Sequence, residues 1–473
     1  MNEYYDYVKD LTDEKKKSMG IVYTPMNIVN WINEKVLSHW KEQRPPRVVD
    51  FSCGTGVFLK DMADKISERY GLSLSEVYSK YIFGSDIDED ALQICRKNTG
   101  CPNITYLDGL DFDPSQYDII VGNPPYVRLR NLDEDTQKKV KSFPWCKVGN
   151  TDLYIAMSEI ICKSGKIFGF ISPNSWIKSS TGKPMAEWFL EKQIVTDFID
   201  FRGKKVFDVG AYCSILISDS QSHSQYNFST DIGAEHEQKK YAEQDSSTFY
   251  LSESEISFVN SILEKPVRLL DVCDLKVGIA TLCDGIYFMK DCVVEDDLVI
   301  FGGTQIEKGA TKLCYKASKL DRYDKATEDR IIYPYDDKTK PFDEEWFKCT
   351  YPMAYDYLSQ HKDKLLSRDK NKFGKKVKEG KATWYEYGRL QGLSLKDEKI
   401  LVCPIMTKKT FMKIDSGLFL SGYCLIAKNN IDIDEILTAV QSESFREWAK
   451  LFGSPKQGGY FSINKATIEK YRY

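Results

Sequence analysis

The sequence of 473 residues contains no long hydrophobic run. No stretch approaches the roughly 20 consecutive apolar residues that are needed to cross a bilayer. The first six residues, Met-Asn-Glu-Tyr-Tyr-Asp, lack the basic and then apolar order of a secretory signal. We therefore expect no membrane partner and a cytoplasmic location.

Metal-binding and crosslinking patterns are also missing. Histidine occurs only four times, at isolated positions, and none of the 13 cysteines forms a Cys-x-x-Cys pair. Structural zinc sites need such clusters, so buried reduced thiols are the default interpretation of the cysteines. We expect no metal.

A strong excess of one charge is absent as well. Lys and Arg number 66 against 70 Asp and Glu, which gives a net charge of −4. This balance does not indicate nucleic-acid binding, although an acidic total can still contain a basic cleft. Apolar residues at 42% and charged residues at 29% are ordinary for a globular protein, and the length allows two domains.

The sequence does contain an unusual polar turn, Gly122-Asn123-Pro124-Pro125-Tyr126, directly after an apolar run. Two prolines fix φ and remove two N–H donors, so the turn has little freedom. The side-chain oxygen of Asn123 and the carbonyl of Pro124 can then face one point beside the ring of Tyr126. Two acceptors and an aromatic wall suit a planar NH2 group on a ring, whereas an ordinary proline turn is the simpler alternative.

A glycine turn occurs earlier in the chain. Arg47–Phe51 predicts a strand, Ser52-Cys53-Gly54-Thr55-Gly56 a tight turn, and the residues from Val57 a helix. Glycines after a strand let a ligand approach the backbone closely. The absence of Gly-x-Gly-x-x-Gly and of Gly-Lys-Ser/Thr disfavours dinucleotides and nucleoside triphosphates. Asp50 can face an ammonium group of a zwitterionic ligand, although a plain strand-to-helix turn is an equal alternative.

Two further predicted strands end in acid, at Asp86 and at Asp108. An acid at the end of the second strand commonly accepts hydrogen bonds from ribose hydroxyls, and Asp108 could accept from an adenine amino group. Thr24 is expected to cap the helix Met26–Trp40, where a carboxylate could bind. These strand ends and the polar turn should lie on one sheet edge, where ligands bind in open α/β sheets.

Strand and helix patterns alternate over roughly 200 residues, which predicts a doubly wound α/β domain at residues 1–245. Residues 127–152 are expected to form a loop region whose cations, among them Arg128 and Arg130, contact phosphates or are simply solvated. Residues 219–250 predict an edge hairpin or a linker. The alternation then disappears, and residues 246–473 predict an α+β domain.

One stretch of the second domain is strongly basic. Residues 362–381 hold nine Lys and Arg against three acids, and an aromatic and polar segment follows that contains Trp384, Tyr387, Arg389 and Gln391. Lysines such as Lys375 and Lys376 can neutralise phosphates, while Arg and Gln can pair with base edges. The alternative is a solvated charged face.

Together these motifs resemble the TaqI-like, gamma-class DNA adenine-N6 methyltransferases. The resemblance runs in the family's order, from Tyr23-Thr24-Pro25 through Asp50–Gly56, Asp86 and Asp108 to Asn123–Tyr126, and it resumes at Trp384–Arg389. The Asn-Pro-Pro-Tyr box in this order is highly specific for amino-group methylation. The stretch Ser180-Thr181-Gly182-Lys183 lacks an aromatic residue that members often have there, and it looks similar to the CamA-type orphan methyltransferases.

The resemblance implies a Rossmann-like methyltransferase sheet, a target-recognition domain, and S-adenosylmethionine as the methyl donor. The methyl group would pass to N6 of an adenine flipped out of duplex DNA. Asn123 and Pro124 would bind the target amino group, and Tyr126 would stack on the target base.

The same resemblance implies the remaining contacts. The donor would contact Tyr23, Thr24, Asp50, Ser52, Cys53, Gly54, Gly56, Asp86, Ile87, Asp108, Asn123 and Pro125. DNA would contact Arg128, Arg130, Lys375, Lys376, Trp384, Tyr387, Arg389 and Gln391. The expected partners are double-stranded DNA and a cognate restriction endonuclease, and the chain itself is expected to be a monomer.

Two other functions compete with this one. An enzyme that methylates an RNA base or a protein glutamine could use the same box, but such relatives are short, and more than 200 additional residues argue against them. A non-catalytic DNA-binding subunit of a restriction complex is disfavoured by the intact box. No convincing metal-nuclease signature is present, so a fused nuclease is not expected.

Overall fold

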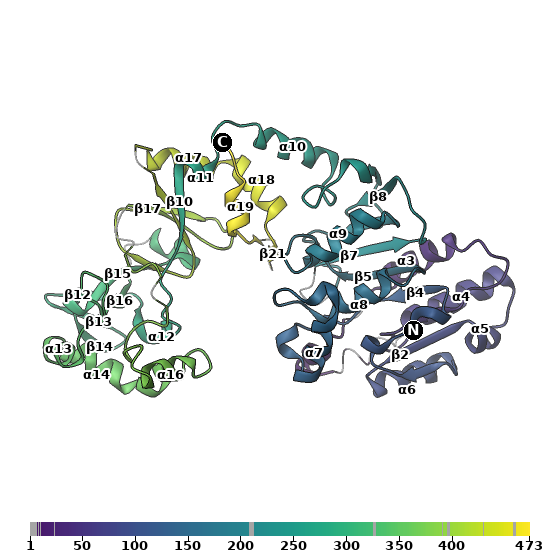
Figure 1. Cartoon of the computed structure of the whole chain (residues 1–473), viewed down its shortest axis with the longest axis horizontal. Coiled ribbons are helices and arrows are strands. Elements are labelled where there is room, and N and C mark those ends of the chain that lie inside the picture. Colours follow the sequence, from purple (N-terminus) through teal and green to yellow (C-terminus); the bar gives the residue numbers. More distant parts are fainter. Residues whose placement is uncertain are drawn as a thin grey trace. The chain divides into compact units, whose positions relative to one another are not determined.

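The computed structural model describes residues 7, 9, 11–22, 24–207, 212–324, 328–389, 391–394, 398–428, 430–456 and 460–473. The chain forms two compact units, Met1–Ser257 and Phe258–Tyr473 (Figure 1). They divide within α10 (Glu253–Leu263), a little beyond the boundary placed near residue 245 from the sequence. Among the described residues no helix is long and apolar enough to cross a membrane.

The first unit contains a large mixed sheet with the strand order β3-β2-β1-β4-β5-β7-β6-β8-β9. The pairs β3–β2, β2–β1, β1–β4 and β4–β5 are parallel, whereas β7 runs antiparallel to both β5 and β6. This sheet confirms the doubly wound α/β fold. The bounds are β1 (Val48–Asp50), β2 (Ile82–Asp86), β3 (Ile104–Tyr106), β4 (Ile119–Gly122), β5 (Ile167–Pro173), β6 (Val195–Asp200), β7 (Cys213–Ser218), β8 (Gln225–Ser229) and β9 (Glu237–Lys240).

Helices cover both faces of this sheet (Figure 1). Strand β5 shows why, because its side chains alternate between the faces. At Gly169 a Cβ would lie 2.6 Å from Val36 of α3 (Met26–His39), so α3 packs directly on the strand. The ring of Phe168 lies 6.4 Å from that of Trp188 on α9 (Lys183–Lys192). The other helices are α2 (Asp13–Met19), α4 (Val57–Tyr70), α5 (Leu74–Lys80), α6 (Glu89–Thr99), α7 (Glu134–Ser142) and α8 (Leu153–Cys162).

Two polar segments of the first unit contain secondary structure. Residues 127–152 are not mainly loop, because they hold η3 (Leu129–Asn131), α7 and η4 (Pro144–Cys146). Helix α7 was hard to detect because Val140 is its buried residue and the rest of its surface is polar. The polar segment 219–250 contains the antiparallel pair β8–β9, which is the edge hairpin of the two alternatives.

The second unit is built from small sheets and short helices. One sheet has the order β10-β20-β17-β18 and another β11-β16-β15-β19. Gly285–Met289, which resembles a strand in sequence, is mostly the short helix α12 (Asp284–Tyr287) followed by β11 (Phe288–Met289). The other strands of the two sheets are β10 (Cys273–Val277), β15 (Thr311–Lys316), β16 (Arg330–Ile332), β17 (Lys399–Val402), β18 (Phe411–Ile414), β19 (Leu418–Leu420) and β20 (Tyr423–Ala427).

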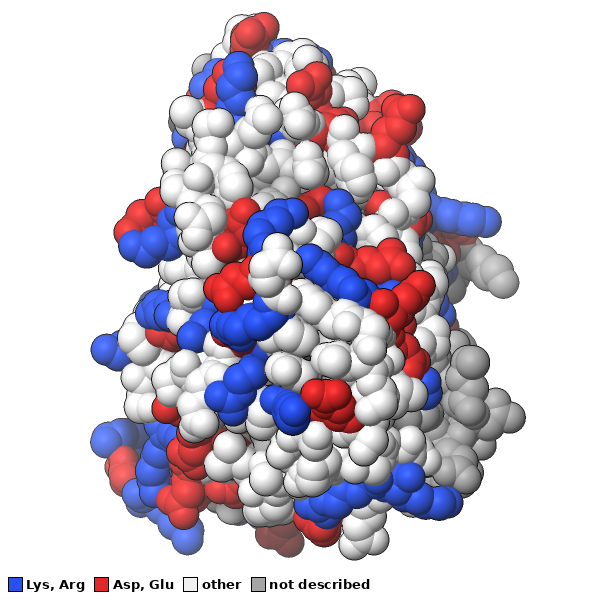
Figure 2. Space-filling view, turned by 90° about the vertical axis from the view of Figure 1, so that its right-hand side faces the viewer, with Lys and Arg blue, Asp and Glu red and all other residues white. Residues whose placement is uncertain are grey.

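The remaining elements of the second unit complete its α+β character. A third sheet joins β12 (Val293–Glu295), β13 (Leu298–Phe301) and β14 (Thr304–Glu307), and β21 (Pro455–Lys456) pairs with β22 (Tyr460–Phe461). The helices are α11 (Leu269–Val272), α13 (Glu344–Thr350), α14 (Pro352–Gln360), α15 (Lys362–Leu366), α16 (Lys372–Lys378), α17 (Ile433–Gln441), α18 (Glu443–Phe452) and α19 (Lys465–Glu469). Figure 2 shows the side that lies at the right of Figure 1, where the first unit is, and on it acidic and basic side chains are interspersed.

Candidate active site

The polar turn begins where β4 ends, beside its parallel neighbour β1. The Asn123 amide nitrogen Nδ2 donates to Thr24 Oγ1 at 3.0 Å and to the Val22 carbonyl at 3.4 Å. Only the amino end of an amide can donate to a carbonyl, so these contacts fix the orientation of the group. The other end, Oδ1, is buried and has no hydrogen-bond partner among the described residues. A buried acceptor without a partner costs free energy, so this oxygen is suited to an N–H donor from a ligand.

Thr24 has a different role from the one expected from the sequence. Pro25 is the N-cap of α3, and no side chain caps that helix. The hydroxyl of Thr24 instead accepts from Asn123, and Thr24 is 3% exposed. Tyr23, which the sequence also places at the site, lies outside the described residues.

Tyr126 forms an aromatic wall next to the turn. Its ring centroid lies 6.4 Å from that of Tyr154 and 6.2 Å from that of Phe207. Burial raises the pKa of its hydroxyl well above the usual range, so the hydroxyl stays neutral.

Gly20 contacts the backbone of Tyr126, and no sequence pattern singles it out. Its carbonyl accepts from the Tyr126 backbone N–H at 3.2 Å. A Cβ at Gly20 would lie 2.5 Å from that nitrogen, and Gly20 has a positive φ of 65°, a backbone conformation that glycine adopts without strain.

The two acids at the ends of β1 and β2 hold the glycine turn. Asp50 Oδ1 accepts from the Ser52 N–H at 3.0 Å, and Asp86 Oδ2 accepts from the Gly54 N–H at 2.8 Å. Burial, with a smaller contribution from the charge of Asp86, raises the pKa of Asp50 to about 7. The pKa of Asp86 is also raised, mainly by burial. A cation bound next to Asp50 would therefore favour its ionised form.

Asp108 follows β3 and has two partners. Its Oδ1 accepts from the Leu110 N–H at 2.9 Å, and its Oδ2 pairs with Lys139 Nζ of α7 at 2.7 Å. Lys139 also pairs with Asp111 at 2.5 Å. Lys139 is thus tied to acids beside the site, which argues against the phosphate contact expected for the cations of this segment. Nothing in the sequence distinguishes Lys139 from its neighbours Lys138 and Lys141.

Several of the residues described above line one cavity of about 490 Å³ in the first unit. That volume is within the range of small-ligand sites. Gly56, Pro124 and Tyr126 adjoin lining residues in the chain without lining the cavity themselves. The sequence-predicted residues that do line it are Thr24, Asp50, Ser52, Cys53, Gly54, Asp86, Ile87, Asp108, Asn123 and Pro125.

The cavity has further apolar walls. Ile87, an expected donor contact, is 50% exposed, and Tyr106, at the end of β3, is 65% exposed, so both offer apolar surface at the cavity. Met157 lines it from α8, and residues 18–22 line it from the N-terminal segment. Tyr106 is the last residue of β3, and nothing in the sequence separates it from an ordinary strand residue.

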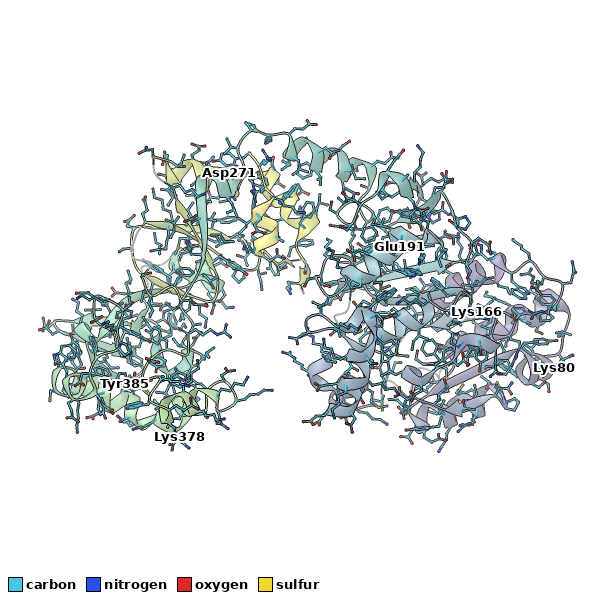
Figure 3. The ribbon with its side chains drawn as sticks, viewed as in Figure 1. Lys80, Lys166, Glu191, Asp271, Lys378 and Tyr385 are labelled. Carbon is cyan, nitrogen blue, oxygen red and sulfur yellow. The ribbon has the colours of Figure 1, made fainter. Side chains whose placement is uncertain are left out.

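The residues expected to touch DNA separate into two groups. Arg128 and Arg130 in the first unit are exposed, as are Lys375, Lys376, Arg389 and Gln391 in the second. Lys378, the last residue of α16, lies at the edge of the second unit in Figure 3.

Trp384 and Tyr387 are not on the surface. They are 4% and 1% exposed, and both belong to a core cluster of the second unit. The indole of Trp384 donates to Glu344 at 2.8 Å, and the hydroxyl of Tyr387 donates to the Ile332 carbonyl at 2.6 Å. In this structure the two rings support the segment that carries Arg389, which corrects the expectation that they contact DNA.

This chain is similar to known proteins of restriction-modification systems. Residues 97–207 match a family described as Eco57I restriction-modification methylase. The type II restriction enzyme and methyltransferase RM.Eco57I of Escherichia coli is 23% identical over 456 residues, which cover 86% of this chain and 45% of that protein. The type II methyltransferase M.BanIII of Aneurinibacillus aneurinilyticus is 24% identical over 509 residues, which cover 91% of this chain and 85% of that protein.

Solved structures share the fold. The type IIL restriction-modification enzyme MmeI in complex with DNA aligns with a TM-score of 0.63 at 12% identity, over 98% of this chain and 69% of that chain. The type ISP enzyme LlaBIII bound to DNA aligns with a TM-score of 0.52 at 11% identity, over 90% of this chain and 36% of that chain. The present chain therefore spans less than half of RM.Eco57I and of LlaBIII, but most of M.BanIII.

Proposed function

We propose that the chain is a site-specific DNA methyltransferase of the TaqI-like, gamma class, which transfers a methyl group from S-adenosylmethionine to N6 of adenine. One observation carries the proposal: Asn123 Oδ1 is a buried acceptor that has no partner among the described residues. The hydrogen bond from Asn123 Nδ2 to Thr24 fixes its orientation beside the cavity. An exocyclic amino group supplies the N–H that this oxygen lacks. The similarity to RM.Eco57I and M.BanIII supports methyl transfer as the chemistry.

The residues of the cavity fit S-adenosylmethionine. The carboxylate of Asp50 can take the ammonium group, and Asp86 and Asp108 can accept from the ribose hydroxyls and the adenine amino group. Gly54 has a positive φ of 51° and nothing within 4 Å of its Cβ position, so a ligand can approach its backbone closely. When bound, this cofactor supplies an electrophilic methyl group on a sulfonium sulfur.

The turn then orients the acceptor. Asn123 Oδ1 and the Pro124 carbonyl accept the two N–H groups of the target, which raises the electron density on the nitrogen. Tyr126 offers its ring to the face of the base. Catalysis by positioning and polarisation does not require an ionised Tyr126, which agrees with its neutral hydroxyl, and the proton that the methylated nitrogen gives up passes to water.

Duplex DNA is the substrate that we favour. The target atom cannot be reached inside a duplex, so the adenine must flip out, at a cost of a few kcal/mol. The second unit would be the target-recognition domain, in which the exposed Lys375, Lys376, Arg389 and Gln391 contact DNA. RM.Eco57I is a restriction enzyme as well as a methyltransferase, so a cognate restriction endonuclease is the second partner that we propose.

Incubation of the protein with labelled S-adenosylmethionine and mixed-sequence duplex DNA tests the proposal. Nucleoside analysis should find the label in N6-methyladenine. Label in N4- or C5-methylcytosine instead would contradict the adenine specificity. Parallel reactions with RNA and with protein extracts separate DNA methylation from the RNA-base and glutamine alternatives, because label transfer to either of these alone would refute a DNA substrate.

A further inference from the structure

A second hollow, of about 480 Å³, lies entirely within the second unit. It is bordered by the end of β10, by the turn that follows, and by the residues just before β20. Two of its apolar side chains are unusually exposed, Val277 at 49% and Leu282 at 40%. Its lining includes Val277, Leu282, Asp284, Gln391, Ser421 and Gly422.

Leu282 is held in a conformation that a leucine rarely adopts. Its φ is +57°, in the left-handed region, where a branched side chain is strained. Ser421, on another side of the hollow, also has a positive φ of 59°. Strain of this kind persists only where the surroundings over-determine it, and it is concentrated at functional sites.

The residue before Leu282 shows how the turn is fixed. The Thr281 carbonyl accepts from Arg368 Nη1 at 2.8 Å and from the Gly388 N–H at 3.1 Å. The Thr281 hydroxyl donates to Asp284 at 2.6 Å and accepts from the Cys283 N–H at 3.0 Å. Thr281 itself is fully buried, so Leu282 is presented by a rigid turn.

The side chain of Leu282 rests on Gly388. A Cβ at Gly388 would lie 2.5 Å from the Leu282 side chain, so only glycine leaves room for it there. Nearby, Gln391 Nε2 donates to the Gly278 carbonyl at 3.2 Å. Among the described residues this is the one hydrogen bond of the Gln391 side chain, which is exposed and keeps Oε1 and its second N–H for a ligand.

Cations adjoin this rigid turn. Arg368, which holds Thr281, also donates to the Glu386 and Trp384 carbonyls, and it opens a segment with seven basic and two acidic residues up to Lys381. Lys375 and Lys376 on α16 belong to that segment. Exposed cations on a segment that is tied through Arg368 to the turn beside a mixed apolar and polar hollow fit a partner that has phosphates on its outside and base edges within its groove.

We infer that this hollow reads base edges of the recognition sequence, with Leu282 in contact with a thymine methyl group and Gln391 paired to a neighbouring base. The inference rests on the proposed function and adds the residues that set its sequence specificity. Apolar side chains distinguish base pairs through the thymine methyl group in the major groove, and Gln can pair with adenine. The strain at Leu282 is explained by the need to present an apolar group to solvent in a fixed direction.

Methylation of a randomised duplex library, followed by sequencing of the modified sites, tests the inference. The central variant is Leu282→Gly, because glycine accepts a positive φ without strain, and thermal unfolding checks that the variant is folded. Its preference at one base pair of the site should fall roughly tenfold, which is within the range of a single base contact. Gln391→Ala should relax a neighbouring position, and Val293→Ala, an exposed apolar change on β12, should relax none.

The possible results are distinct. An unchanged site profile for both Leu282→Gly and Gln391→Ala, with both proteins folded, would overturn the inference. A profile changed to the same extent by Val293→Ala would overturn it too, because the effect would not be local to the hollow. If the wild-type protein methylates no DNA while RNA or protein accepts the methyl group, the proposed function fails and the inference fails with it.

Discussion

Replacing Asp50 by asparagine should make the free protein more stable and its cofactor binding weaker. Asp50 is 2% exposed, at the carboxyl end of β1. Gly122 packs against it so closely that a Cβ there would lie 2.6 Å from Asp50 Oδ1. Asparagine has nearly the same shape, and its oxygen can still accept from the Ser52 N–H that Asp50 now binds at 3.0 Å. The substitution therefore removes the charge and little else.

The magnitude follows from the pKa. Burial raises the pKa of Asp50 from 3.8 to about 7. Between these two pH values the folded state holds a proton that the unfolded state has lost, so the stability of the wild type falls as pH rises. At about 1.4 kcal/mol per pH unit, ionisation of the buried carboxylate lowers the free energy of unfolding above pH 7 by at most about 4 kcal/mol. Asp50→Asn should avoid most of this cost.

Cofactor binding should show the opposite dependence. An ammonium group pairs only with the ionised carboxylate, so affinity for S-adenosylmethionine should rise about tenfold per pH unit below pH 7 and then level off. Calorimetric titration between about pH 5.5 and 7.5, with denaturant unfolding at the same values, measures both effects. An affinity that does not depend on pH, or equal affinity in the wild type and Asp50→Asn, would refute the assignment of Asp50 to the ammonium group.

Three other predictions concern the target base and DNA. Asn123→Ala should lower methyl transfer by about 100-fold or more, because an acceptor aimed at the reacting amino group is lost, while cofactor affinity stays within about threefold. Tyr126→Phe should keep most activity and Tyr126→Ala should lose most of it, in steady-state assays, because in the proposed mechanism the ring and not the hydroxyl contacts the base. Lys375→Glu with Lys376→Glu should weaken DNA binding and flatten its dependence on salt in titrations, because fewer counterions are released.

Each of these has its own control and counter-result. Normal turnover of Asn123→Ala would show that the acceptors are misassigned. Equal activity losses in the Phe and Ala variants of Tyr126 would mean that the hydroxyl matters. The charge reversal of exposed lysines elsewhere in the second unit, Lys338→Glu with Lys348→Glu, should leave the salt dependence of DNA binding near that of the wild type. If it flattens that dependence equally, the effect is one of net charge.

The strand ends and the polar turn are the parts of the site that sequence patterns predict well. Asp50, Asp86 and Asn123 each follow an apolar run, and parallel strands bring such ends to one edge of the sheet. The roles of Gly20 and Lys139 could not be predicted, because both act on residues about 30 or 100 positions away in the chain. Such contacts depend on tertiary packing, which short-range patterns do not encode.

The aromatic residues of the second unit show a different limit. Trp384 and Tyr387 occur next to basic residues, and this order looks the same whether the rings face DNA or the core. Tyr385 lies inside the unit in Figure 3, and its hydroxyl donates to the Phe342 carbonyl at 2.6 Å. The short irregular strands of this unit lack a clear period, so its sheets and the direction of its side chains were beyond sequence reasoning.

A crystal structure of the protein with duplex DNA and an unreactive S-adenosylmethionine analogue tests the central claim most directly. The account predicts an adenine outside the helix, with N6 about 2.7–3.2 Å from both Asn123 Oδ1 and the Pro124 carbonyl, a normal hydrogen-bond distance. A structure in which Asn123 Oδ1 pairs with the protein itself, and the target base lies away from the turn, would contradict it.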